Sequence, residues 1–345
     1  MNRRTFLLGA SVLGTTATAC SRGGPRLNVY NWSDYIAPGT VAKFERETGI
    51  RVRYGVYESV QEMLAKVMSG NSGWDVVFPS SEYLQPLRDL GLLAELRHDW
   101  LPNLTSLDPT FQRPPWDAEL RWSVPYMHGT TGITVQRSLA PPLTSWADLW
   151  SPRLASKITM LDDSTEVFGA CLKMLGYSLN STDPAELRRA QQEALRQRSL
   201  VRAYLNAEVR DQLAAGDVQA AQTWAVTASQ AISAAPERLA YVFPLEGFAR
   251  YADNMAILRE STRLAAAHQF LNYLLRPEVA ADIVRATHTA TANAAALAFL
   301  ADAERTDPVL YPAADTLARG EWFLPQPSAS QRLRDRLWTE LKSSA

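Results

Sequence analysis

The chain carries the sequence Leu27-Asn28-Val29-Tyr30-Asn31 followed directly by Trp32-Ser33-Asp34-Tyr35. The first five residues form a short run rich in β-forming side chains, which predicts a strand. The next four place an acid between two aromatic rings at the end of that strand. Pro38 then begins a predicted helix, and a second strand is expected from Ile50 to Tyr57.

The alternation of strand and helix continues beyond this opening. Ser59 and Glu62 form a capping-box pattern that opens a helix running to Val67. A third strand is predicted from Trp74 to Phe78, and a helix carrying Leu84, Leu87 and Leu90 follows it. This β-α-β-α-β order predicts a parallel sheet with right-handed crossovers, whose ligands lie beyond the carboxyl ends of the strands. Trp32 to Tyr35 and Ser80 to Glu82 occupy such ends.

The rest of the chain predicts a second unit of the same α/β kind. The stretch from Asp99 to Pro125 is rich in Pro and Trp and is expected to be irregular, and a strand from His128 to Val135 is expected to cross between two lobes. Further predicted elements are a strand Lys157–Leu161, a helix capped by Asp183, a helix from Asp217 to Trp224, a strand Tyr241–Phe243 and a helix Ser261–Leu275. A chain of 345 residues is long enough for two cores.

The first nineteen residues predict an export signal. Arg3-Arg4 resembles a twin-arginine start, and the apolar stretch from Phe6 to Leu13 is too short to span a bilayer. Small residues precede Cys20, which is either a lipid attachment site or incidental to a simple cleavage site, and lipidation is favoured. Residues 20–26 are expected to be a tether. Cys171 is the other cysteine, so no internal disulfide is possible if Cys20 is lipidated.

Charge and motifs argue for binding and against several other functions. Without residues 1–19 the chain would carry 33 basic and 36 acidic side chains, which disfavours a nucleic-acid partner. No later segment has the apolar length of a membrane span. The sequence lacks the common hydrolase, nucleotide-binding and zinc-protease motifs, and its four histidines show no metal-ligand spacing. We therefore expect no metal, no cofactor and no enzymatic activity.

Carboxylates and aromatic rings occur together at several predicted strand ends. These groups are Trp32, Asp34 and Tyr35; Glu82 and Tyr83; Asp163, Glu166 and Phe168; Trp224; and Tyr251 with Asp253. Aromatic faces attract ammonium groups, and carboxylates offset the cost of dehydrating them. The combination suggests a ligand with ammonium groups at both ends of an apolar chain.

Each of these residues also has a structural explanation. Asp163 and Glu166 could cap a helix, and Asp34 could cap the turn before Pro38. Trp32 and Trp224 could simply pack in a core. Asp253 could pair with Arg250. Glu82 is typical of a solvated acid in a first helical turn.

Longer strings in the sequence resemble the bacterial spermidine/putrescine-binding proteins, which are receptors of polyamine ABC importers. The resemblance is specific in Val29 to Pro38 and is supported by the segments Phe44–Ile50, Trp74–Ser80, Ser145–Trp150, Glu166–Phe168 and Phe270–Pro277. It covers about Leu27 to Leu341, in matching order.

The resemblance implies the type II periplasmic binding protein fold, an α/β architecture of two lobes with two mixed sheets flanked by helices and a hinge between them. Lobe 1 would comprise residues 27–128 and about 253–297, and lobe 2 about 129–252 and 298–345. The implied ligand-binding residues are Trp32, Ser33, Asp34, Tyr35, Ser80, Glu82, Asp163, Glu166, Trp224, Tyr251 and Asp253.

The resemblance also implies a function. The protein would be a monomeric receptor in the periplasm or on the outer face of the cytoplasmic membrane. The residues before Cys20, rather than the resemblance, predict that a lipid at Cys20 is its only attachment to the membrane. The receptor would capture a putrescine- or spermidine-like polyamine and deliver it to an inner-membrane ABC permease. The alternatives are a receptor of the same superfamily for another organic amine, an exported enzyme on this scaffold, or a sensor.

Four positions depart from the family pattern. Thr289 replaces a tyrosine, Thr227 replaces an acid of the putrescine type, Glu82 stands where the spermidine type has tyrosine, and Arg250 adds a positive charge near Asp253. Tyr251 stands in place of a tryptophan or phenylalanine. The acids Asp34, Asp163, Glu166 and Asp253 are retained, so we expect a cationic ligand whose identity is open.

Overall fold

The computed structural model describes residues 26–343. Its first part confirms the predicted alternation: β1 (Arg26–Trp32), α1 (Thr40–Thr48), β2 (Arg51–Tyr57), α2 (Val60–Met68), β3 (Val76–Val77) and α3 (Ser81–Asp89). Strand β1 lies between β2 and β3 and is parallel to both. The Ser59 side chain accepts a hydrogen bond from the Glu62 backbone N–H, so the predicted cap of α2 is present.

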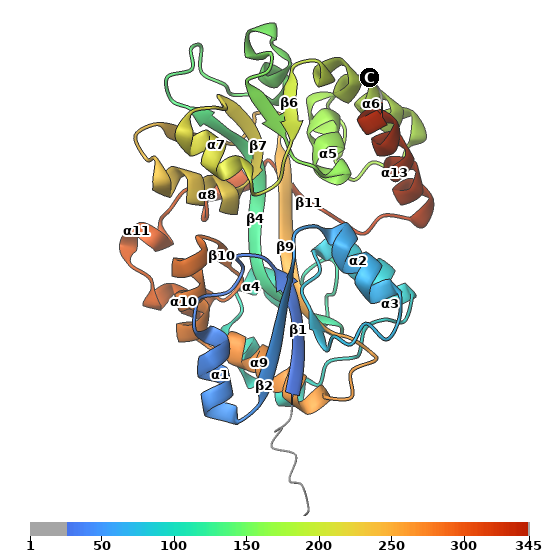
Figure 1. Ribbon diagram of the computed structural model, residues 1–345, viewed down its shortest axis with the longest axis vertical. Coiled ribbons are helices and arrows are strands. Elements are labelled where there is room, and N and C mark those ends of the chain that lie inside the picture. Colours follow the sequence, from blue (N-terminus) through green and yellow to red (C-terminus); the bar gives the residue numbers. More distant parts are fainter. Residues whose placement is uncertain (1–25, 344–345) are drawn as a thin grey trace, which may run out of the picture.

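Two long strands join the two ends of the molecule. Strands β4 (Ser123–Gln136) and β9 (Phe248–Ile257) pair antiparallel along most of their length and run through the middle of the molecule (Figure 1). The strand order is β2-β1-β3-β9-β4-β7-β5-β6. The predicted α/β class with mixed pairing is therefore confirmed, and the two groups of strands are continuous through β4 and β9.

The second group of strands follows β4 in the chain. Its elements are β5 (Ile158–Met160), α5 (Ser164–Met174), α6 (Pro184–Arg198), β6 (Val201–Tyr204), α7 (Val209–Ala215), β7 (Ala220–Trp224), α8 (Ala225–Ala234) and β8 (Leu239–Val242). Strand β5 is parallel to β6 and β7, whereas β7 and β8 are antiparallel to β4. The predicted cap of α6 is present, because the Asp183 side chain accepts from the Ala185 N–H.

The helix predicted from Asp217 to Trp224 is wrong. Residues Ala220 to Trp224 form strand β7 inside the sheet, between β4 and β5, and the helix α8 begins after Trp224. Alanine and glutamine favour helices in isolation. The strand is nonetheless formed, because its pairing with β4 and β5 outweighs the local helix propensity. Since the strand is buried on both faces, its sequence also lacks the alternation of apolar and polar residues that marks a half-exposed strand.

The remaining elements complete the two ends. They are α9 (Leu264–Leu274), α10 (Pro277–Thr287), β10 (Ala290–Thr291), β11 (Gly320–Trp322), α13 (Ser328–Ser343), the short helices α4 (Pro109–Gln112), α11 (Asp302–Arg305) and α12 (Ala314–Leu317), and the 3₁₀ turns η1 (His98–Trp100), η2 (Pro102–Ser106), η3 (Trp146–Trp150), η4 (Pro152–Leu154) and η5 (Ala294–Phe299). The stretch Asp99–Pro125, predicted to be irregular, thus holds short helical turns and the start of β4.

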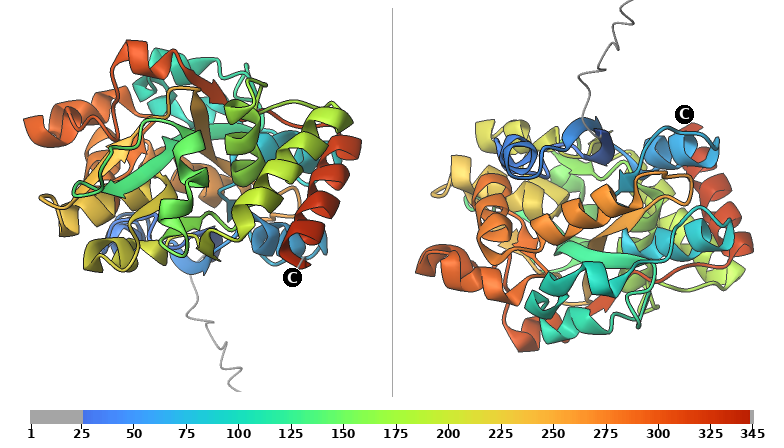
Figure 2. Two further views of the ribbon diagram at one scale, coloured as in Figure 1. Left: turned by 90° about the horizontal axis from the view of Figure 1, so that it is seen from above. Right: turned by 90° about the horizontal axis from the view of Figure 1, so that it is seen from below.

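The apolar interior is divided in the same way as the strands. One large cluster includes Phe44, Leu87 and Phe270, and a second includes Phe168 and Leu337. Helix α13, at the carboxyl end of the chain, packs on α5 and α6 (Figures 1 and 2). The lobe boundaries expected from the resemblance stay a prediction.

The predicted export signal (residues 1–19), Cys20 and most of the predicted tether lie outside the described residues. Within residues 26–343, no helix has both the length and the apolar character needed to cross a membrane. The same residues contain no group of His, Cys, Asp and Glu side chains arranged to hold a metal ion. Cys171 is a buried free thiol in α5.

Candidate functional site

A cleft opens beside β4 and β9, where strands and helices of both ends of the molecule meet. It is lined by ten of the eleven predicted binding residues, namely Trp32, Ser33, Asp34, Tyr35, Ser80, Asp163, Glu166, Trp224, Tyr251 and Asp253. The rule that ligands lie beyond the carboxyl ends of parallel strands thus located the cleft, because Trp32 ends β1 and Ser80 follows β3.

The end of β1 and the turn after it place one fixed ring, Trp32, and one exposed acid, Asp34, in the cleft. The Trp32 indole N–H donates to the Phe78 carbonyl at 3.0 Å, and its ring lies 4.6 Å from the Tyr57 ring. Asp34 has a left-handed backbone (φ 52°), and its side chain is 76% exposed. Its carboxylate lies 4.0 Å from Arg210 Nη1 of α7. Asp34 is therefore a rim residue.

Asp253 is a buried carboxylate on strand β9, with 4% exposure. The Tyr35 hydroxyl donates to its Oδ2 at 2.9 Å, and Ser80 Oγ donates to its Oδ1 at 2.6 Å. Burial raises the pKa of Asp253 to about 6, although these two hydrogen bonds oppose that shift. The suggested ion pair with Arg250 does not form, because residues three apart on a strand point to opposite faces. The Arg250 guanidinium lies instead over the Trp322 ring at 4.0 Å.

Glu166 is a second buried carboxylate, on helix α5. Its Oε1 accepts hydrogen bonds from the Trp224 indole N–H at 2.7 Å and from Thr131 Oγ1 at 2.9 Å. Its Oε2 is buried and has no hydrogen-bond partner within the described chain. Burial raises the pKa of Glu166 well above its usual range, and nearby Asp163 adds to this shift. A cation in the cleft would supply the missing partner.

Asp163 serves both roles considered for it. Its Oδ1 accepts from the backbone N–H groups of Thr165 (2.7 Å) and Glu166 (3.1 Å), so it is the N-cap of α5. It also lines the cleft. Burial raises its pKa, whereas the two backbone hydrogen bonds lower it.

Glu82 is the predicted residue that the structure places elsewhere. It lines a neighbouring cavity, together with residues of α2, α3 and the carboxyl-terminal part of the chain. Successive residues on a helix point about 100° apart, so Ser80 and Tyr83 face the cleft while Glu82 faces away from it. Tyr83 lines both spaces.

Several lining residues were not predicted as binding residues. They are Glu58, Val60, Tyr83, Asn206, Ala207, Val226, Thr227 and Gln230. Glu58 follows the carboxyl end of β2, so the strand-end rule could have found it. Gln230 could not have been found in that way, because it lies within α8 and enters the cleft through the packing of that helix. Thr289, one of the departures, is buried and does not line the cleft.

The model of one protein family matches residues 39–313, and its description is "bacterial extracellular solute-binding protein". The chain belongs to this family. Solute-binding proteins of this family are extracellular, which indicates a location outside the cytoplasm.

Relatives of this solute-binding protein share most of its length. The spermidine/putrescine-binding periplasmic protein of Salmonella typhimurium is 35% identical over 324 residues, which cover 93% of this chain and 92% of the relative. A putrescine-binding periplasmic protein of Escherichia coli is 33% identical over 357 residues, covering 98% and 96%. A solved structure of a putative spermidine/putrescine ABC transporter protein from Listeria monocytogenes is 33% identical, with a TM-score of 0.89 and coverage of 93% and 99%. These findings confirm the resemblance and the fold class.

The charge on Asp253 should make the solute-binding protein's stability depend on pH in a defined direction. Because its pKa is raised, the folded state holds a proton on Asp253 between about pH 4 and 6 that the unfolded state lacks. Without ligand, this residue therefore destabilises the fold as pH rises through that window. We expect Asp253→Asn to gain in melting temperature relative to the unsubstituted protein between pH 4.5 and 7.5. Asp34→Asn, the exposed control, should show no such trend, and a relative loss for Asp253→Asn would contradict the burial argument.

Gly129 on β4 provides a test of the part of the cleft wall that Tyr251 forms. A Cβ at this position would lie 2.6 Å from Cζ of Tyr251, so an alanine would push the Tyr251 ring out of place. We expect Gly129→Ala to weaken ligand binding about tenfold, because the displaced Tyr251 ring no longer lines the cleft in its original position. At Gly169, on α5, an added Cβ meets its nearest atom at an ordinary 3.7 Å. Gly169→Ala should thus bind normally in the same titration, and equal affinities would show that Tyr251 does not shape the site.

Proposed function

We propose that this solute-binding protein captures a di- or polyamine, similar to putrescine or spermidine, in the cleft between its two lobes. The observation that carries this proposal is a pair of buried carboxylates, Asp253 and Glu166, that have no cationic partner within residues 26–343. They come from opposite ends of the molecule, Asp253 beside Tyr35 and Ser80, and Glu166 from helix α5. Two ammonium groups on one ligand would give each of these carboxylates a cationic partner.

The surroundings of the two carboxylates support a cation of this shape. Among the described residues that line the cleft, none is a lysine or an arginine. A buried carboxylate is costly unless it is paired, and a bound ammonium supplies the pair. The rings of Trp32, Tyr35, Trp224 and Tyr251 offer apolar faces for the methylene chain and further attraction for its charged ends.

Binding in such a cleft couples to closure of the lobes. Asp34 from the turn after β1 and Arg210 from α7 approach each other across the mouth of the cleft. A ligand that contacts both walls binds the closed form better than the open form and so shifts the equilibrium towards closure. The closed, loaded protein would then be recognised by an inner-membrane ABC permease. We propose that the protein acts as a monomer, with no enzymatic activity, no cofactor and no nucleic-acid partner.

The membrane attachment in this proposal rests on the sequence alone. Cys20 would carry the lipid after export through a twin-arginine signal, and the lipid would be the protein's sole link to the membrane. The relatives named as spermidine/putrescine-binding and putrescine-binding periplasmic proteins support an extracytoplasmic role of this kind.

A thermal-shift screen of the purified protein tests the proposed function. We expect putrescine or spermidine to raise the melting temperature by about 4 °C at roughly a hundredfold excess over the dissociation constant. Glycine betaine, a quaternary amine, and γ-aminobutyric acid serve as comparison ligands. Stabilisation by one of these alone would favour the alternative, a receptor for another organic amine. Turnover of any amine would favour an exported enzyme.

A further inference from the structure

A second cavity, of about 640 Å³, lies beside the cleft. Residues of helices α2 and α3 line one side of it, and residues of the segment Phe323–Ser328 and of the start of α13 line the other. Tyr83 separates this cavity from the cleft, because its side chain lines both. Nothing in the proposed polyamine site uses this space.

Arg334 of α13 lines the second cavity and is an unusual residue. Its side chain is 1% exposed. Nη2 donates to the carbonyl groups of Leu179 (2.9 Å) and Ser181 (3.0 Å), whereas Nε and Nη1 have no hydrogen-bond partner in the described chain. No carboxylate of residues 26–343 forms an ion pair with it. Burial lowers its pKa to about 10, although Tyr83 and the nearby carboxylate of Asp163 oppose this shift.

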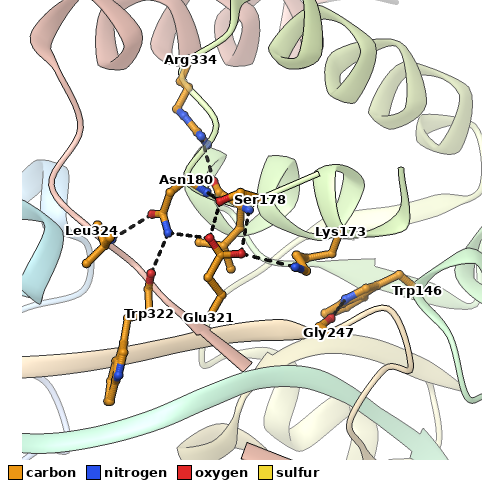
Figure 3. Close-up of polar contacts among 10 residues, drawn as sticks. Trp146, Lys173, Ser178, Asn180, Gly247, Glu321, Trp322, Leu324 and Arg334 are labelled. Carbon is orange, nitrogen blue, oxygen red and sulfur yellow. Dashed lines mark hydrogen bonds and ion pairs between the residues drawn. The ribbon is translucent and has the colours of Figure 1, made fainter. Parts of the chain in front are cut away.

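Glu321, the acid on β11 near this region, is not available to neutralise Arg334. Its carboxylate accepts hydrogen bonds from Ser178, from the Leu179 N–H (3.2 Å) and from Asn180 Nδ2 (3.0 Å), and it pairs with Lys173 at 3.3 Å (Figure 3). Asn180 also accepts from the Leu324 N–H at 2.9 Å. These bonds fix the loop beneath Arg334 and one wall of the cavity, so the guanidinium is held in a preformed position.

The rim of the cavity adds a second cation and an apolar surface. Arg332 is exposed and lines the cavity, and its guanidinium has no ion pair or hydrogen bond among the described residues. Met68 and Leu90, on the opposite wall, are 53% and 57% exposed although both are large and apolar. Of the two acids at this cavity, Asp89 lies 3.7 Å from Arg88, and burial raises the pKa of Glu82 to about 8. The cavity is therefore cationic on one side and apolar on the other.

We propose that this cavity is a second ligand site, which binds an amphipathic organic carboxylate. The carboxylate would enter past Arg332 and come to lie against the Arg334 guanidinium. Its apolar part would cover Met68 and Leu90. A charge-assisted hydrogen bond to a carboxylate is the interaction that an unpaired buried guanidinium lacks, and the apolar wall gains by leaving water.

Occupation of this site should strengthen cation binding in the cleft. The positive charge of Arg334 acts on Asp163, whose pKa it lowers, and so opposes an ammonium group placed near that carboxylate. An anion bound at Arg334 neutralises this charge. Tyr83 lines both spaces, so a ligand in either one can contact the same side chain. By linkage, a polyamine in the cleft would strengthen carboxylate binding by the same factor.

Calorimetric titration of the purified protein with sodium benzoate, at constant ionic strength and without any amine, tests the second site. We expect benzoate to bind and benzamide, its uncharged analogue, to bind at least about tenfold more weakly. Arg334→Gln should weaken benzoate binding about tenfold, and Arg332→Gln should weaken it by a smaller factor. Arg336→Gln is the matched control, because Arg336 is exposed on the same helix but does not line the cavity.

The outcomes separate this site from the polyamine cleft. Equal binding of benzoate and benzamide, or benzoate binding that neither Arg332→Gln nor Arg334→Gln weakens, would overturn the proposal. If Arg334→Gln does not fold, Met68→Trp replaces it as the test variant. The larger side chain narrows the cavity from its exposed wall and should weaken benzoate binding. Leu264→Trp is its control, because Leu264 is exposed but lies outside the cavity. Because benzoate binding is measured without amine, the test of the second site remains valid even if no polyamine binds in the cleft. A separate titration should show tighter putrescine binding in benzoate than in benzamide.

Discussion

Replacing Asp253 with asparagine is expected to weaken putrescine binding by about 100-fold or more. The substitution keeps the size of the side chain and leaves an oxygen for the Tyr35 hydroxyl, so the fold should be retained. It removes the negative charge that faces a dehydrated ammonium at a site with 4% exposure, where water cannot replace it. Calorimetric titration of both proteins at pH 7.5 measures the ratio.

Asp34→Asn is the control for this experiment. Asp34 also lines the cleft, but its side chain is 76% exposed and water screens its charge. We expect its loss to weaken binding by about threefold or less. Similar losses for the two variants would show that burial of Asp253 does not matter. A quaternary ammonium ligand forms no hydrogen bond to Asp253, so a ligand that tolerates Asp253→Asn would point to that alternative.

Glu166→Gln is expected to have an effect of similar size, about 100-fold. A glutamine oxygen could still accept from Trp224 and Thr131, which keeps the wall of the cleft in place. The lost group is Oε2, a buried oxygen that has no hydrogen-bond partner within residues 26–343 and that we assign to the second ammonium.

Glu58→Gln is the matched control for Glu166→Gln, because Glu58 also lines the cleft but is exposed and hydrogen-bonded to Ser33. Titration with putrescine should show a small loss for this control. An unchanged affinity in Glu166→Gln would mean that the ligand does not reach helix α5.

The structure also sharpens the expected pH dependence of binding. From ordinary carboxyl groups alone, affinity would fall as pH approaches about 4. Burial raises the pKa of Asp253 to about 6 and that of Glu166 well above its usual range. A cation binds the ionised forms, so bound protons must leave first. We therefore expect affinity to fall as pH drops below about 6, and a constant affinity from pH 7.5 to 5 would contradict the assigned anchors.

The first half of the fold could be predicted from the sequence because its signals are local. Strand β1, the capped helix α2 and strand β3 follow one another in order, each with its own pattern and boundary residues. Strand β7 could not be predicted, because its alanine and glutamine become a strand only through pairing with β4 and β5, which are distant in the chain. The continuity of the sheet through β4 and β9 is likewise a property of long-range pairing.

The same distinction applies to the site. Trp32 and Ser80 could be placed in a cleft because they follow parallel strands. The hydrogen bond from the Tyr35 hydroxyl to Asp253 could not be predicted from either segment, because the two residues are 218 positions apart in the chain. Glu82 and Tyr83 are neighbours in sequence, and the orientation of helix α3 decides which of them faces the cleft. Arg334 gave no signal in the sequence, since its burial results from the packing of α13.

The most direct test of the central claim compares putrescine with butylamine, a monoamine of the same chain length, by calorimetric titration of the purified protein. If Asp253 and Glu166 each take one ammonium group, putrescine should bind about 100-fold more tightly, because butylamine leaves one buried carboxylate without a partner. Equal affinities, or no binding of putrescine at millimolar concentration, would contradict the claim that this cleft holds a ligand with two positive charges.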